Sequence, residues 1–202
     1  MAKRRVAVIG LDHYHTTGWV ESLALFPDEL EIVAIYEPDR SLWQRMAPRY
    51  VDPHLSARLH DRHLDTPFVG ELDALIDEYR PEIALVTLPS VAAPAAIETL
   101  AGAGVHLLVD KPGAANRQAA KAAFGIARER NVKVATGLLR CYGRGWQYAH
   151  SLCREGRPGR LLSTETIFNT SSPFVRNSNN HLFSRELQGG GILLWLGIHE
   201  ID

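Results

Sequence analysis

The sequence has only two cysteines among 202 residues, Cys141 and Cys153, and no long apolar run. Two cysteines cannot form the disulfide framework of a small secreted domain, and these two lack the spacing of a metal-binding pair. A helix that crosses a bilayer needs about 18 apolar residues in a row or more, so we expect no membrane segment. These absences together indicate a protein of the reducing cytoplasm.

A large net charge is missing as well, because the formal charge is -1 at pH 7. The sequence therefore gives no electrostatic reason to expect nucleic acid or a membrane surface as a partner. The chain starts with a basic stretch, Lys3-Arg4-Arg5, but the apolar run behind it ends at Leu11. That run is shorter than the roughly 7 to 15 residues of an export signal, so we expect a buried strand there instead.

What the sequence does have is a regular alternation of short apolar runs with helical stretches. The predicted strands cover residues 6–10, 31–36, 82–87, 105–109 and 132–136. The predicted helices cover residues 16–26, 41–50, 71–79, 94–103 and 117–130, and the stretch 54–67 gives no assignment. Strands and helices that alternate in this way form βαβ units and a parallel sheet. We therefore predict an α/β fold, a doubly wound Rossmann-type domain, over residues 1–137.

The pattern changes after Thr136. A helix is predicted over 146–155, an alternating strand over 161–169 and a loop over 169–181, after which three glycines precede an apolar helix over 192–201. Because the sequence stops inside that helix, we expect residues 138–202 to be the incomplete start of a second α/β domain with an open sheet, and the chain to be a fragment.

The turn Gly10-Leu-Asp12-His-Tyr-His15 follows the first predicted strand. The dinucleotide fingerprint has glycines at three positions of this turn, and here Asp12 and His15 stand at the second and third. A carboxylate near a pyrophosphate is repulsive unless its side chain caps the helix N-terminus. An ordinary strand–turn–helix is the alternative interpretation of this segment.

Two further residues fall at the carboxyl ends of predicted strands, where ligands bind in this fold. Glu37 can accept hydrogen bonds from ribose hydroxyls and disfavours a 2′-phosphate, so we expect NAD. Arg40 would attract that phosphate, which leaves NADP open. Lys111 can position a hydroxyl or transfer a proton, because desolvation lowers the pKa of a lysine. The alternative for Glu37 is an ordinary acid that follows a strand, and the alternative for Lys111 is a surface lysine beside Asp110.

The apolar tail contains His199, which shares a helix face with Trp195 and Asp202 at this spacing. A histidine there can act as acid or base or bind a substrate hydroxyl, although a packed core histidine is the alternative. Two histidine groups raise the question of a metal: Asp12 with His13 and His15, and His54 with His60 and His63. Neither group has recognised ligand spacing, so we expect no metal.

Taken together, these segments resemble the Gfo/Idh/MocA family of oxidoreductases. Residues 103–112 read Ala-Gly-Val-His-Leu-Leu-Val-Asp-Lys-Pro, where the family has A-G-K-H-V-x-x-E-K-P. Residues 189–202 read Gly-Gly-Gly-Ile-Leu-Leu-Trp-Leu-Gly-Ile-His-Glu-Ile-Asp, where the family has G-G-G-x-L-x-D-x-G-x-H-x-x-D. The resemblance implies an NAD(P) domain followed by an α/β domain that carries substrate contacts and usually the oligomer interface.

The resemblance also implies an activity, the oxidation or reduction of a hydroxyl or carbonyl on a sugar, cyclitol or related polyol, in a homo-oligomer when the protein is full length. Lys111 would contact the reacting oxygen, and His199 would act in proton transfer or substrate binding, beside Trp195. The residues expected at the cofactor are Gly10, Asp12, His15, Glu37, Arg40, Pro89 and Lys111.

The sequence departs from the family pattern at three positions. Trp195 stands where the family usually has an aspartate, Ala93 stands where it often has a histidine, and Asp110 replaces a glutamate. The loss of the aspartate puts the usual substrate geometry in doubt. A nucleotide-binding sensor or assembly protein of the same fold, without catalysis, is therefore the alternative function.

Overall fold

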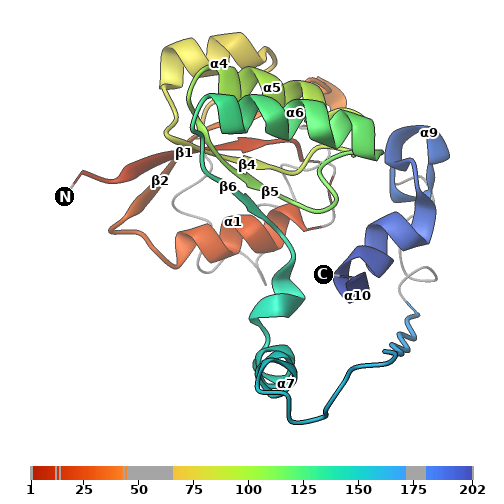
Figure 1. Cartoon of the computed structure of the whole chain (residues 1–202). Coiled ribbons are helices and arrows are strands. Elements are labelled where there is room, and N and C mark those ends of the chain that lie inside the picture. The colour runs from red at the N-terminus through yellow and green to blue at the C-terminus, as the bar shows by residue number, and fades with distance from the viewer. Residues whose placement is uncertain are drawn as a thin grey trace.

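The computed structural model describes residues 2–11, 13, 15–42, 44, 66–171 and 181–201. One sheet of six parallel strands has the order β3-β2-β1-β4-β5-β6. The strands are β1 (Arg4–Ile9), β2 (Leu30–Tyr36), β3 (Phe68–Val69), β4 (Ile83–Val86), β5 (His106–Val109) and β6 (Val134–Thr136). The helices of this part are α1 (Thr16–Ala24), α4 (Leu72–Tyr79), α5 (Ala93–Gly102) and α6 (Arg117–Glu129). Figure 1 shows α1 on one face of the sheet and α4, α5 and α6 on the other, so the predicted doubly wound Rossmann fold is confirmed.

Both faces of the central strands are covered, which explains their continuous apolar sequence. Residues 6–9 of β1 and residues 84–86 of β4 are all buried, as expected for parallel strands between two helical layers. The larger core lies under α4, α5 and α6 and includes Leu75, Ile97 and Leu100. The smaller one lies on the other face and includes Val20 of α1. Asn116 caps α6, since its side chain accepts a hydrogen bond from the Ala119 N–H at 2.9 Å.

The strand order places a crevice at the carboxyl edge of the sheet. From β1 the chain winds outward through β2 to β3, and then returns to β4 on the other side of β1 before winding on to β6. The direction of winding thus reverses between β1 and β4. In open α/β sheets ligands bind outside the carboxyl ends of the strands at such a switch point.

The predicted strand over residues 161–169 is wrong. Residues 161–171 have no regular secondary structure, and Leu161, Leu162 and Ile167 are 60%, 77% and 75% exposed. An alternating pattern becomes a strand only where a neighbouring strand supplies hydrogen bonds, and the described residues offer no such neighbour there. The helix before this stretch, predicted over 146–155, is present as α7 (Arg144–Arg154), which follows the 3-10 turn η1 (Leu139–Tyr142).

The last described segment folds back on the Rossmann part as a series of short helical turns, drawn in blue in Figure 1. These are η2 (His181–Phe183), α9 (Arg185–Gln188), the π-helical η3 (Leu193–Gly197) and α10 (Ile198–Ile201). The predicted helix over 192–201 is therefore present, but its middle is a π-helix, which changes the spacing of residues on its faces. Asp202 lies outside the described residues, as do most of the helix predicted over 41–50 and the histidines 54, 60 and 63. Within the described part of the chain, no helix combines the length and apolar character that crossing a membrane requires.

Candidate cofactor and active site

The turn after β1 requires glycine at its first position. Gly10 has a φ of 94°, and a Cβ atom built on it would lie 2.9 Å from the backbone nitrogen of Leu88. The hydroxyl of Thr87 donates a hydrogen bond to the Gly10 carbonyl at 2.7 Å. The ends of β1 and β4 are thus tied together at the switch point, and only a residue without a side chain fits between them.

The amino end of α1 follows this turn and faces the crevice. His15 is its N-cap residue and makes no side-chain capping bond, and the first turn of the helix has no acidic residue. The hydroxyl of Thr16 is buried and has no hydrogen-bond partner in the described part of the chain. A helix end of this kind attracts anions, so these residues fit the diphosphate of a dinucleotide. Asp12 lies outside the described residues, and its predicted role therefore stays a prediction.

Glu37, at the end of β2, is buried against the glycine turn. One carboxylate oxygen accepts a hydrogen bond from the Leu11 N–H at 2.9 Å, and the other accepts one from the Asp39 N–H at 3.1 Å. The carboxylate therefore stabilises the turn. It also lies at the strand end where a ribose would approach. Arg40, the other residue predicted near the ribose, is exposed. Contact of either residue with a cofactor stays a prediction.

Lys111, which follows β5, is 3% exposed and bound to the last helical segment. Its Nζ atom donates a hydrogen bond to the Trp195 carbonyl at 2.6 Å and lies 4.7 Å from the centre of the Trp195 ring. The structure therefore brings together two of the predicted site residues that stand 84 positions apart.

Pro89, after β4, is half-buried, and its carbonyl accepts hydrogen bonds from the Ala92 and Ala93 N–H groups at 2.9 Å each.

His199 lies in α10, on the same side of the molecule as Lys111. Its Nδ1 atom is buried without a hydrogen-bond partner among the described residues. Burial lowers the pKa of His199, and the positive charges of Lys111 and then Arg140 lower it further. The imidazole is therefore neutral at pH 7 and able to accept a proton. An ion pair between Arg140 and Glu200 joins η1 to this helix.

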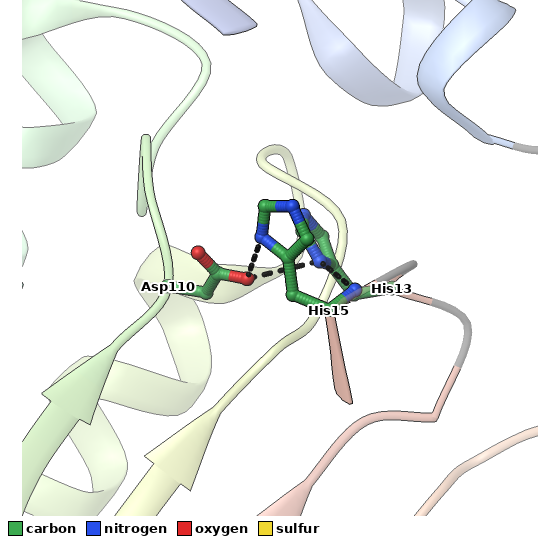
Figure 2. Close-up of side chains that lie close together, drawn as sticks. All are labelled: His13, His15 and Asp110. Atoms are coloured by element: carbon green, nitrogen blue, oxygen red, sulfur yellow. Dashed lines mark hydrogen bonds and ion pairs between the residues drawn. The ribbon is translucent and has the colours of Figure 1, made fainter. Parts of the chain in front are cut away.

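The structure also brings together three residues that the sequence did not connect, His13, His15 and Asp110. Figure 2 shows both imidazoles turned toward the carboxylate, and each Nδ1 atom lies 3.0 Å from the same oxygen, Oδ2 of Asp110. The two histidines were grouped with Asp12 in the sequence, but their acidic partner is 95 residues away from His15. The sequence marked Asp110 only as an acid at the end of a buried strand.

Burial and contact act in opposite directions on the ionisation of this cluster. Burial alone would raise the pKa of Asp110, but the hydrogen bonds from His13 and His15 outweigh it and hold that pKa well below its usual range. Burial lowers the pKa of His13, more than contact with Asp110 raises it. At neutral pH the cluster is thus a carboxylate facing a neutral His13.

One protein family matches this chain by sequence. The family model described as an oxidoreductase family with an NAD-binding Rossmann fold, Gfo/Idh/MocA, covers residues 4–138. No curated protein matches the chain by sequence. The sequence comparison thus assigns the Rossmann part and leaves the remaining residues unassigned.

Solved structures share the arrangement of the chain. The WlbA dehydrogenase from Bordetella pertussis, solved with NADH and UDP-GlcNAcA, has a TM-score of 0.77 and 20% identity, over 100% of this chain and 58% of that one. Levoglucosan dehydrogenase has a TM-score of 0.77 and 20% identity, over 100% of this chain and 51% of that one. The scyllo-inositol dehydrogenase from Lactobacillus casei, solved with NAD(H) and scyllo-inositol, has a TM-score of 0.72 and 17% identity, over 100% of this chain and 55% of that one. The chain therefore spans a little more than half the length of these proteins, and at such identities the likeness concerns the fold.

Proposed function

Since the chain belongs to the Gfo/Idh/MocA family of oxidoreductases, we propose that the protein is an NAD-dependent oxidoreductase of a sugar, cyclitol or related polyol. The observation that carries this proposal is the position of Lys111, a buried ammonium group directly after β5 that is bound to Trp195 in η3, the helical segment directly before α10 and His199. The named substrates of the similar structures, scyllo-inositol among them, support the same class.

The cofactor would lie across the carboxyl ends of β1, β2 and β4. The amino end of α1 and the Gly10 turn would hold its diphosphate, and Glu37 would accept hydrogen bonds from the ribose hydroxyls. A buried carboxylate repels a 2′-phosphate, so we propose a preference for NAD over NADP, with exposed Arg40 reducing the difference. The bound nicotinamide supplies the hydride acceptor or donor.

Lys111 and His199 would handle the oxygen and its proton. The ammonium group of Lys111 can donate a hydrogen bond to the reacting oxygen once it exchanges the Trp195 carbonyl for substrate. The neutral imidazole of His199 can accept the hydroxyl proton, because its lowered pKa leaves it deprotonated at pH 7. The ring of Trp195 would form a wall for the sugar, in place of the polar contact that an aspartate makes.

Titration with NADH and NADPH, followed by nicotinamide fluorescence, tests the cofactor. We expect saturable binding of NADH and weaker binding of NADPH. We expect Lys111→Ala to lower kcat at least about 100-fold, the lower range for a group that acts in proton transfer, while NADH binding is kept. Unchanged turnover in this variant would contradict the assigned role of Lys111, and absence of NADH binding by a folded protein would contradict the proposed function.

A second function, a nucleotide-binding sensor or assembly protein without catalysis, is favoured by one observation. The ammonium group of Lys111 is already bound to the Trp195 carbonyl, and Trp195 stands where the family usually has an aspartate. A protein of this kind would bind NADH yet turn over no polyol. Screening the protein with NAD against a set of sugars and cyclitols separates the two, because any turnover excludes the sensor.

A further inference from the structure

The cluster of His13, His15 and Asp110 has the composition and spacing of a metal site. One nitrogen or carboxylate oxygen from each side chain lies within 4.8 Å of those of the other two. His13 and Asp110 are each 4% exposed, whereas the side chain of His15 is 33% exposed. The cluster is therefore mostly enclosed by protein, and its exposed member is His15.

Hydrogen bonds within the cluster do not satisfy His13 in either neutral form. Its Nδ1 atom lies 3.0 Å from Asp110 Oδ2 and also 3.1 Å from the backbone N–H of His15, while its Nε2 atom is buried without a partner among the described residues. A proton on Nδ1 leaves the buried Nε2 lone pair unsatisfied. A proton on Nε2 leaves the buried Nε2–H group unsatisfied and sets the Nδ1 lone pair, which then accepts the bond from the His15 N–H, against a carboxylate oxygen as well. Unmet polar groups cost free energy when buried.

We propose that His13, His15 and Asp110 bind one divalent transition metal ion, of the class that includes Fe²⁺ and Zn²⁺. Two imidazoles and one carboxylate suit these ions better than Mg²⁺ or Ca²⁺, which prefer oxygen ligands. Ligand atoms about 2.0–2.1 Å from a tetrahedral ion are separated by roughly 3.3 Å. The two 3.0 Å contacts to Asp110 are close to that spacing, and the three ligand atoms lie within 4.8 Å of one another, so the two imidazoles have to approach for all three to bind one ion.

The charges around the cluster act in opposite directions on a bound cation. The Asp110 carboxylate attracts it, whereas the amino end of α1 and the neighbouring Lys111 disfavour it. The buried ring of His181 lies 5.5 Å from that of His13, centre to centre, and is a third imidazole beside the cluster. Three protein ligands leave a coordination position for water or for a substrate oxygen. This ion site goes beyond the proposed function, and it revises the expectation from sequence that the protein holds no metal.

Titration of the metal-free protein with Co²⁺, without nucleotide and after removal of any affinity tag, tests the site. Co²⁺ replaces Zn²⁺ or Fe²⁺ at nitrogen and oxygen ligands and gives visible absorption bands. We expect one equivalent to bind, and we expect His15→Gln and Asp110→Asn to weaken binding by at least about tenfold, the lower range for loss of an outer-shell partner. His150→Gln, a change of an exposed histidine on α7, is the matched control and should bind as the parent does.

The His15→Gln variant keeps the test decisive if Asp110→Asn fails to fold, because the His15 side chain is partly exposed whereas Asp110 is buried. Circular dichroism establishes that each variant is folded. No uptake of Co²⁺ by the folded parent overturns the proposal, and so does uptake that His15→Gln leaves unchanged. Because no nucleotide is present, failure of the metal site is distinguishable from failure of NADH binding, which is measured separately.

Discussion

At the scale of single residues, Glu37 combines an observed structural role with a proposed binding role. Its carboxylate is buried at the end of β2, in the position of a ribose-binding acid, yet both oxygens already accept backbone hydrogen bonds from the neighbouring turn. The same side chain therefore shapes the turn that would receive the diphosphate. We expect substitutions here to change the stability of the turn and nucleotide binding together, so matched variants are needed to separate the two roles.

Gly10 offers such a comparison for the turn itself. We expect Gly10→Ala to lower the free energy of unfolding by about 1–3 kcal/mol, as for overpacked sites. The new Cβ would lie 2.8–2.9 Å from Leu88, at a φ of 94° that disfavours any side chain. Urea unfolding measures the effect.

Gly18→Ala is the control, with the opposite sign expected. Gly18 lies exposed in α1, and a Cβ there meets nothing within 4 Å. Alanine should therefore stabilise the helix by up to about 1 kcal/mol. Equal stability of Gly10→Ala and the parent would show that the turn tolerates a side chain, contrary to the close approach of β1 and β4.

At the scale of elements, the amino ends of β1 and β4 are joined by charge. Arg4 forms an ion pair with Glu82, and the other carboxylate oxygen of Glu82 accepts a hydrogen bond from the Arg5 N–H at 3.2 Å. The bond from Arg4 lowers the pKa of Glu82 most, followed by that from the Arg5 backbone. A carboxyl whose pKa is lower in the folded state contributes stability above its unfolded pKa and loses it as the pH falls through the folded pKa.

We therefore expect Glu82→Gln to be less stable than the parent at pH 7, and the difference to shrink as the pH falls below the ordinary pKa of a glutamate. The decrease at pH 7 should be small, because the pair is exposed and screened by solvent. Urea unfolding of both proteins over this pH range measures it, and 0.5 M NaCl should reduce the difference at pH 7. A difference that persists undiminished at low pH would assign the effect to packing of the glutamate side chain.

At the scale of the whole molecule, the segment 181–201 returns to the Rossmann part and packs beside the residues that follow β4 and β5. Gly189 approaches it closely, since its φ is 82° and a Cβ built on it would lie 2.8 Å from the Ala115 carbonyl oxygen. Hydrogen bonds of Lys111 with Trp195, Ser90 with Gln188 and Val91 with Leu187 also join the two parts. Together they place Trp195 and His199 beside the end of β5.

Gly189→Ala should loosen this segment without affecting the sheet. We expect amide hydrogen exchange over residues 181–201 to become roughly tenfold faster, the effect of about 1.4 kcal/mol, while exchange in β1 and β4 stays unchanged. Gly191→Ala is the control, because Gly191 also has a positive φ, 63°, but open space around its Cβ position. Equal effects of the two variants would assign the change to backbone strain rather than to the contact with Ala115.

The sequence by itself determined the sheet, its helices and most of their bounds, because apolar periodicity and turn residues are local signals. It also identified Gly10, Glu37 and Lys111 at strand ends, since parallel strands bring their carboxyl ends to one edge. It missed β3, which has two residues and no periodicity of its own, and it assigned residues 161–169 to a strand that has no partner.

Only the tertiary structure decided which of these residues meet. The convergence of His13 and His15 on Asp110 joins the ends of β1 and β5, and the bond from Lys111 to Trp195 depends on a segment that folds back across 84 residues. Glu37 was visible as an acid, but its bond to the glycine turn was not. Such contacts depend on strand order and on the path of the last helices, and no local pattern in the sequence encodes either.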